Sequence, residues 1–301
     1  MGKLDGRVAL VTGAGTSGGS GMGEFAVKEL AAQGAKVVVC AHSMKNAVRV
    51  ANEIIADGGE AVPFELDVAS AEQNEQAVKL AIDTFGRLDV LCLVAGTTIQ
   101  APIDEMTKEQ FTSMVDINLM QAFYLCHYAV PQMKKQKYGR IVVYASRGAF
   151  GVPEAPVKSC GYAASKAAAI GFCAEVAIEA ESWDGDFRVN CVLPAAATAL
   201  FPNQRKAAYG GTPSPYPAGP EMTAPMPVYL CSEECVCNGE VFYVAGTDVA
   251  LFPRYPKAIG YMHKGNYEKW TVDELAEQVP GAFGWYFETR PHKSNYDMKT
   301  R

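Results

Sequence analysis

The sequence predicts an α/β protein with a doubly wound parallel sheet, a Rossmann-like arrangement of about seven strands in a single domain with a C-terminal extension. Two observations predict this class. Short apolar runs rich in β-branched residues alternate with segments of helical periodicity, as in a parallel sheet covered on both faces. A glycine-rich stretch also separates the first apolar run from the first helical segment, which is the usual position of a dinucleotide loop.

The expected elements follow one another along the chain. Strands are predicted at residues 7–11, 36–40, 61–66, 88–94, 139–144, 187–193 and 241–244. Helices are predicted at residues 22–33, 45–56, 72–85, 108–135, 162–181 and 223–230, where apolar residues recur at helical spacing. Residues 201–227 contain seven prolines and three glycines and are expected to form a long loop over a binding site.

The end of the alternating pattern predicts a division of the chain. We expect residues 1–252 to form the nucleotide-binding domain and residues 253–301 an aromatic C-terminal extension. Thr271 and Glu274 have the spacing of a capping box, so a helix is expected to begin there. The extension is interpreted as a segment that packs over the active site or against a neighbouring subunit, with binding of another partner as the alternative.

Composition limits the possible functions. The chain has 301 residues, of which 49% are apolar and 20% charged, and a formal net charge of −6. It has no run of basic residues, which argues against nucleic-acid binding. It also has no apolar stretch long enough to span a membrane and no signal peptide, so we expect a cytoplasmic protein with no membrane partner.

The cysteines are expected to be reduced thiols. There are nine of them, an odd number scattered through apolar segments. Cys231, Cys235 and Cys237 have the spacing C-x3-C-x-C, which differs from the paired C-x2-C spacing of structural zinc sites. No metal is expected.

The glycine-rich stretch predicts a coenzyme site. It begins at Thr12, follows a buried strand and opens a helix, and its glycines would let the backbone approach a pyrophosphate at the helix N-terminus. The candidate coenzyme-binding residues in it are Gly13, Gly15, Ser20, Gly21, Met22 and Gly23.

Tyr162 and Lys166 form a second chemical motif, Y-x3-K, inside an alanine-rich helical segment. The i, i+4 spacing places the phenol and the ammonium on one helix face. A cation beside a phenol lowers the pKa of the phenol toward the range useful for proton transfer. We therefore predict that Tyr162 is the proton donor and Lys166 its partner.

Together these motifs resemble the short-chain dehydrogenase/reductase family over about residues 4–250. The family fingerprint T-G-x3-G-x-G is lengthened here: Ser17 stands at the middle glycine position, and Gly21 and Gly23 close the motif after four extra residues. This spacing is similar to that of the enoyl reductase branch. The usual N-N-A-G after the fourth strand is replaced by L-V-A-G, so a polar prop of the central sheet is missing.

The resemblance implies roles for further residues. Ser146 matches the catalytic serine, and Asn118 matches the asparagine of a water-mediated proton relay. The family's coenzyme contacts correspond to Ala41, His42, Ser43, Asp67, Val68, Ala95, Gly96, Tyr162, Lys166, Pro194 and Thr198. Ala41 stands where an acidic residue would select NAD, so NADP(H) is the preferred prediction and NAD(H) the alternative.

These features predict reversible, NAD(P)-dependent interconversion of a ketone and a secondary alcohol. Phe150, Phe201 and Tyr209 favour a small hydrophobic polycyclic or aromatic substrate of the steroid, bile acid or flavonoid type, and Arg147 allows an anionic one. An enoyl reductase of the same fold and a non-catalytic NADP-binding regulator remain as alternatives. The resemblance also implies a homo-oligomer, either a dimer or a tetramer.

Overall fold

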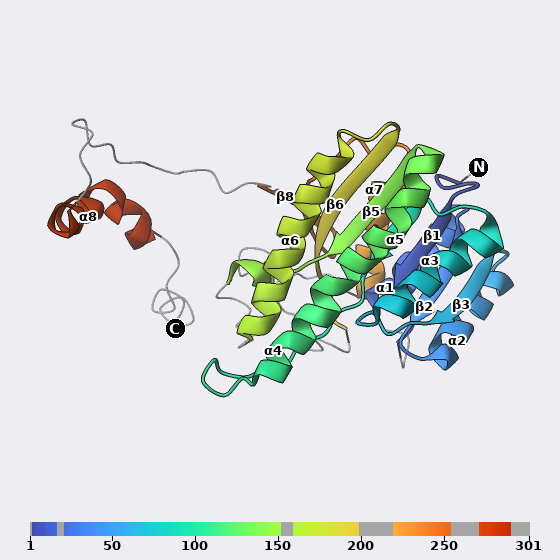
Figure 1. Cartoon of the computed structure of the whole chain (residues 1–301), viewed down its shortest axis with the longest axis horizontal. Helices are drawn as coiled ribbons and strands as arrows, with labels where there is room; N and C mark the ends of the chain where they lie inside the picture. The colour runs from blue at the N-terminus through green and yellow to red at the C-terminus, as the bar shows by residue number, and fades with distance from the viewer. Residues whose placement is uncertain (1, 17–20, 152–158, 199–218, 254–270, 290–301) are drawn as a thin grey trace. The chain divides into compact units, whose positions relative to one another are not determined.

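The computed structural model describes residues 2–16, 21–151, 159–198, 219–253 and 271–289. It contains two compact units, Met1–Arg254 and Tyr255–Arg301. The first unit is built on one eight-stranded sheet in the order β3-β2-β1-β4-β5-β6-β7-β8 (Figure 1). The strands are β1 Val8–Thr12, β2 Lys36–Ala41, β3 Ala61–Glu65, β4 Val90–Leu93, β5 Tyr138–Tyr144, β6 Asp186–Ala195, β7 Val241–Ala245 and β8 Asp248–Phe252.

The predicted doubly wound parallel sheet is confirmed. Strands β1 to β7 all run parallel, and their order reverses between β1 and β4, which places a crevice at the carboxyl ends of these two strands. Helices cover both faces, and the central strands β1, β2 and β4 are largely apolar because both of their faces are buried.

The helices divide between the two faces. Helices α3 (Ala71–Phe85), α5 (Gln121–Gln136) and α6 (Cys160–Ala180) pack on one face. Helices α1 (Met22–Ala32), α2 (Met44–Ala56) and α7 (Pro225–Cys231) pack on the other face.

Strand β8 was not predicted. It runs antiparallel to β7 and joins it through the two residues Gly246 and Thr247, with Gly246 at φ +55°. Residues 249–252 are a continuous apolar run, so a signal for a strand was present, although Val249 and Leu251 are exposed in the structure. A glycine in a two-residue connection was the available signal for a hairpin.

The helical segment predicted over residues 108–135 is confirmed, but it is not one regular α-helix. The segment consists of α4 (Lys108–Val115), a π-helical turn η1 (Asp116–Met120) and α5. The π-helical turn adds one residue between two α-helical segments, and Asn118 lies within it, 2% exposed. Asn118, the residue that matches the family motif, therefore lies in the π-helical turn and not in a regular α-helix.

The described part of the proline-rich stretch contains helical turns that were expected to be loop. Residues 201–218 lie outside the described part of the chain, whereas Pro220–Thr223 form a short 3₁₀ helix, η4, and α7 begins at Pro225. Proline is well tolerated in the first turn of a helix, where its missing N–H would have no partner within the helix.

The second unit contains helix α8 (Val272–Thr289). Its capping box is the one predicted: the Glu274 backbone N–H donates to Thr271 Oγ1 at 3.2 Å, and the Thr271 N–H donates to Glu274 Oε2 at 2.8 Å. Among the described residues, no helix has the length and apolarity needed to cross a bilayer.

Candidate active site

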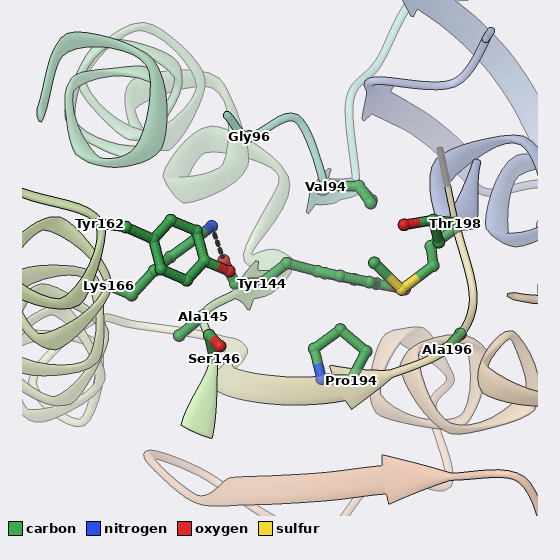
Figure 2. A pocket seen from close by; sticks show the side chains of 11 residues that line it. Val94, Gly96, Tyr144, Ala145, Ser146, Tyr162, Lys166, Pro194, Ala196 and Thr198 are labelled. Atoms are coloured by element: carbon green, nitrogen blue, oxygen red, sulfur yellow. Dashed lines mark hydrogen bonds between the residues drawn. The ribbon is translucent and has the colours of Figure 1, made fainter. Parts of the chain in front are cut away.

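A pocket lies at the carboxyl ends of the central strands, where the sheet order reverses (Figure 2). It brings together residues from β5, β6, α1, α6 and the loop after β4, including most of the candidates for the reacting end of the site. Its lining residues are Met22, Val94, Gly96, Tyr144, Ala145, Ser146, Tyr162, Lys166, Pro194, Ala196 and Thr198.

Lys166 is held in this pocket by the backbone of a neighbouring strand. Its Nζ donates to the carbonyl oxygen of Tyr144, the last residue of β5, at 2.8 Å and lies 6.0 Å from the centroid of the Tyr162 ring. The side chain comes from α6 and is almost fully buried. Burial disfavours the ammonium form and lowers the pKa of Lys166 to about 8.

Tyr162 lies on the same face of α6 and is also buried. Burial raises its pKa above the ordinary value, and a hydrogen bond with Ser146 acts in the opposite direction. The sequence predicts that Lys166 lowers this pKa, but burial of the phenol is the largest effect and raises it.

Ser146 occupies the turn that follows β5. Its hydroxyl accepts a hydrogen bond from the Gly148 backbone N–H at 3.0 Å and caps a short 3₁₀ helix, η2 (Arg147–Phe150). This cap fixes the serine beside Tyr162, and the two hydroxyls form a pair at the pocket wall. Two adjacent O–H groups can both donate to one oxygen atom of a ligand.

Asn118 holds together the backbone around the pocket. Its Oδ1 accepts from the Thr97 N–H at 2.8 Å, and its Nδ2 donates to the Thr97 carbonyl and to Ser165 Oγ, both at 3.0 Å. Ser165 Oγ in turn donates to the Tyr162 carbonyl at 2.9 Å. The amide therefore ties the loop after β4 to the helix that carries Tyr162 and Lys166.

Gly96 leaves room between Asn118 and Lys166. A Cβ atom at this position would lie 3.0 Å from Asn118 Oδ1 and 3.3 Å from Lys166 Nζ. A larger residue would require Asn118 and Lys166 to shift by a few tenths of an ångström, so glycine favours their close approach.

The described ends of the glycine-rich stretch, residues 12–16 and 21–23, form a backbone cradle at the start of α1. Gly13 has φ +63°, and a Cβ on it would lie 2.9 Å from Ala95 Cα. A Cβ on Gly23 would lie 2.3 Å from the Gly13 carbonyl oxygen. Gly21 is the N-cap of α1, so the first turn directs its N–H groups toward the loop. This arrangement fits the pyrophosphate of a dinucleotide. Ser20 lies outside the described residues.

An ion pair that was not predicted supports this cradle. Arg49 on α2 donates to Glu24 Oε2 at 2.6 Å and to the Thr16 carbonyl at 3.3 Å, so it fastens the glycine loop to the next helix. Burial would raise the pKa of Glu24, but hydrogen bonds from Arg49 and Lys28 hold it below its ordinary value. The residues are far apart in sequence, and no local pattern marks the pair.

Thr12 and Gln121 supply the polar support of the central sheet that the L-V-A-G sequence lacks. Thr12 Oγ1 accepts from the N–H groups of Val94 and Ala95 at 3.0 and 3.1 Å and donates to Gln121 Oε1 at 2.9 Å. Gln121 Nε2 donates to the Ala95 carbonyl at 2.6 Å. A buried glutamine from α5 therefore links β1 to the loop after β4, and sequence reasoning missed it.

Two of the residues expected at the adenosine end, His42 and Asp67, line a separate groove. Its lining residues are His42, Met44, Phe64, Glu65, Asp67, Gln73 and Gln76. Ala41 is buried at the end of β2, and Ser43 is the N-cap of α2. Val68 is buried beside the exposed Asp67, and the Asp67 carboxylate accepts from the Ala69 N–H at 3.0 Å.

The residues expected at the substrate end are only partly described. The Phe150 ring is half exposed and stacks on Phe252 of β8 at 5.8 Å between centroids. The Arg147 guanidinium lies 4.5 Å from the centroid of the Tyr243 ring, which engages it with a neighbouring strand. Phe201 and Tyr209 lie outside the described residues. Among the described residues, no group of three or more His, Cys, Asp or Glu side chains is arranged to hold a metal ion.

The cradle, the sheet reversal and the Ser146, Tyr162 and Lys166 pocket define a nucleotide-dependent oxidoreductase. A model of the short chain dehydrogenase family matches residues 7–208. An uncharacterized oxidoreductase of Thermotoga maritima is 35% identical over 233 residues, which cover 77% of this chain and 87% of that protein. A 3-oxoacyl-[acyl-carrier-protein] reductase of Synechocystis is 41% identical over 197 residues, which cover 64% of this chain and 75% of that protein.

A solved structure agrees with the sequence relatives. The crystal structure of a short chain dehydrogenase from Mycobacterium avium superposes with a TM-score of 0.80 at 28% identity and covers 97% of this chain and 98% of that chain. The chain belongs to the short-chain dehydrogenase/reductase family. It is an oxidoreductase that acts on CH–OH and C=O groups, and its family uses NAD(P)(H).

Proposed function

We propose that the protein interconverts a ketone and a secondary alcohol on a small hydrophobic substrate, with NADP(H) as the preferred coenzyme. The observation that carries the proposal is the meeting of Ser146, Tyr162 and Lys166 in one pocket at the carboxyl edge of the sheet, next to the glycine cradle. The substrate class we favour is a polycyclic or aromatic ketone of the steroid, bile acid or flavonoid type. The exposed Phe150 ring at the substrate end supports this class.

The proposed roles follow from the contacts. The coenzyme supplies or accepts the hydride at its nicotinamide ring. Tyr162 carries its proton at neutral pH, as a phenol ordinarily does and as the raised pKa favours further, and it donates that proton to the carbonyl oxygen as negative charge develops there. Ser146 donates a second hydrogen bond to the same oxygen and stabilises that charge.

Lys166 and Asn118 support Tyr162 and Ser146 without donating a proton to the substrate. Lys166 holds the coenzyme ribose, and its positive charge stabilises Tyr162 after the proton has left. Its pKa of about 8 keeps it largely protonated at pH 7, so the cation is available at the moment of transfer. Asn118 positions α6 against the loop after β4, so it fixes where both groups meet the substrate.

Three further features belong to the proposal. Ala41 leaves the end of β2 without a carboxylate, and the adjacent His42 is exposed, which supports space for a 2′-phosphate and hence NADP(H). We place the protein in the cytoplasm. We also propose that it acts as a homodimer or homotetramer, whose only other partner is its small-molecule substrate.

The experiment is a coenzyme-linked assay across a panel of ketones. The panel contains steroid, bile acid and flavonoid ketones, a 3-oxoacyl thioester suggested by the Synechocystis relative, and matched enones. We expect oxidation of NADPH with a ketone by the wild type and a loss of about 10²-fold to 10⁴-fold in kcat for Tyr162→Phe. Turnover of enones but not ketones would replace the proposal with an enoyl reductase. Tight coenzyme binding with no turnover would favour a regulator.

A further inference from the structure

Glu65 is a charged side chain at the adenosine end that the proposed roles do not use. It is the last residue of β3, and in the parallel pairing of β2 with β3 its register partner is Ala41. Paired residues of neighbouring strands direct their side chains to the same face of the sheet, about 5 Å apart. Glu65 therefore presents a carboxylate next to the position where Ala41 lacks one.

The Glu65 carboxylate is directed at the start of α2. Its Oε2 accepts a hydrogen bond from the Met44 backbone N–H, the first residue of α2, at 3.2 Å. The side chain of Ser43, the N-cap residue, makes no such bond within the described residues. A helix N-terminus beside the end of β2 would otherwise be available to an anion such as a ribose phosphate.

The same groove brings the coenzyme-selecting elements together. Glu65 lines it with His42 and Met44 from the end of β2 and the start of α2, and with Asp67 from the loop after β3. Asp67 is a second carboxylate in this groove, and its Oδ1 is already engaged with the Ala69 N–H. Glu65 is thus the acid that contacts the start of α2 and is paired with Ala41, the position where a coenzyme-selecting acid is absent.

We propose that Glu65 is a specificity-determining residue for the coenzyme, which weakens binding of a 2′-phosphate and accepts a hydrogen bond from a free 2′-hydroxyl. This inference rests on the proposed function, because it assumes that the groove receives the adenosine ribose. It deepens the coenzyme assignment. The lack of an acid at Ala41 favours NADP(H), whereas Glu65 limits that preference, so that NAD(H), which has no 2′-phosphate, is also accepted.

The size of the effect follows from simple electrostatics. A unit negative charge about 6 Å from a doubly charged phosphate in water is repelled by about 1.4 kcal/mol, which is about tenfold in Kd. We therefore expect Glu65→Gln to tighten NADPH binding about tenfold at low salt, where screening is weak. The amide oxygen of glutamine can still accept from Met44 and from a 2′-hydroxyl, so NADH binding is expected to change by less than about threefold.

The test compares Kd values of the full-length protein for NADPH and NADH, measured through the change in nicotinamide fluorescence on binding. The two coenzymes differ only in the 2′-phosphate, and the measurement does not depend on turnover. Glu65→Ser removes the same charge and serves as a second variant. Glu60→Gln is the matched control, because Glu60 precedes the opposite end of β3 and pairs with Lys36 at 3.0 Å.

The outcomes separate the two proposals. A rise of threefold or more in the preference for NADPH in both Glu65 variants, with Glu60→Gln unchanged, supports the role of Glu65. A preference that stays within threefold of the wild type overturns that role and leaves the proposed function intact. If the wild type binds neither coenzyme, the proposed function fails, and the role of Glu65 fails with it.

Discussion

Replacing Lys166 with methionine is expected to make the coenzyme-free protein more stable while it abolishes activity. The lysine is almost fully buried, and the hydrogen bond from its Nζ to the Tyr144 carbonyl does not compensate for the lost hydration of the ammonium. Methionine has a similar length, no charge and good packing properties. The active-site cation is therefore held at a cost to the stability of the fold.

The magnitude follows from the pKa. Burial lowers the pKa of Lys166 from the ordinary 10.5 to about 8, which at pH 7 corresponds to about 3 kcal/mol of destabilisation. Loss of the hydrogen bond to Tyr144 offsets about 1–2 kcal/mol of the gain from Lys166→Met. The net expectation is about 1–2 kcal/mol, or about 2–8 °C in Tm for a domain of this size.

The effect has a defined pH dependence. Between pH 8 and 10.5 the unfolded lysine still carries its proton, whereas the folded lysine has lost it. The unfolded state then binds more protons, so the wild type gains stability relative to the variant as pH rises through this window. The advantage of Lys166→Met is expected to be full below pH 8 and to shrink toward pH 10.

The assay is thermal unfolding followed by circular dichroism at pH 7 and pH 9.5, without coenzyme. Lys135→Met on the exposed face of α5 is the control, because it replaces a lysine that is already in contact with water instead of a buried one. A lower Tm for Lys166→Met than for the wild type at pH 7, or a difference between them that is the same at both pH values, would refute the reasoning.

Three other substitutions test separate parts of the site. Gly23→Ala would place a methyl group against the Gly13 carbonyl and is expected to raise the Kd for coenzyme at least tenfold by calorimetry; an unchanged Kd would show that the cradle is not used. Gln121→Leu leaves the Ala95 carbonyl without its side-chain donor and is expected to lower the free energy of unfolding in urea by about 1–3 kcal/mol, a result that equal stability would contradict. Ser146→Ala is expected to lower kcat about 10²-fold with little change in coenzyme affinity, and full activity would exclude the serine from the reaction.

The sheet could be predicted because its central strands are apolar on both faces. Runs such as Val37, Val38 and Val39 stand out in the sequence whatever the rest of the chain does. Strand β8 also has an apolar run, at residues 249–252, but it is an exposed edge strand that runs antiparallel to β7, so it does not fit the alternation of strands and helices that predicts the parallel sheet. The break within the helix at Asn118 was also hidden, because one added residue barely changes the apolar spacing on either side.

The site was predictable where its chemistry is local. Tyr162 and Lys166 are one helical turn apart, and the glycine loop is continuous in sequence. Gln121, Arg49 and Glu65 act on residues that the fold brings to them from elsewhere, so they could be recognised only once strand order and register were known. The sign of the Tyr162 shift likewise depends on burial, which no spacing reveals.

The π-helical turn at Asp116–Met120 constrains how this protein can change its length. Deleting one residue there would convert the π-helical turn into a regular α-helical turn, while α4 and α5 could keep their packing. Asn118 would lose the irregular position from which its amide reaches Thr97 and Ser165, and the support of the site that this amide provides would be lost. Substitutions on the exposed face of this helix are tolerable in evolution or engineering, whereas insertions and deletions within the turn are not.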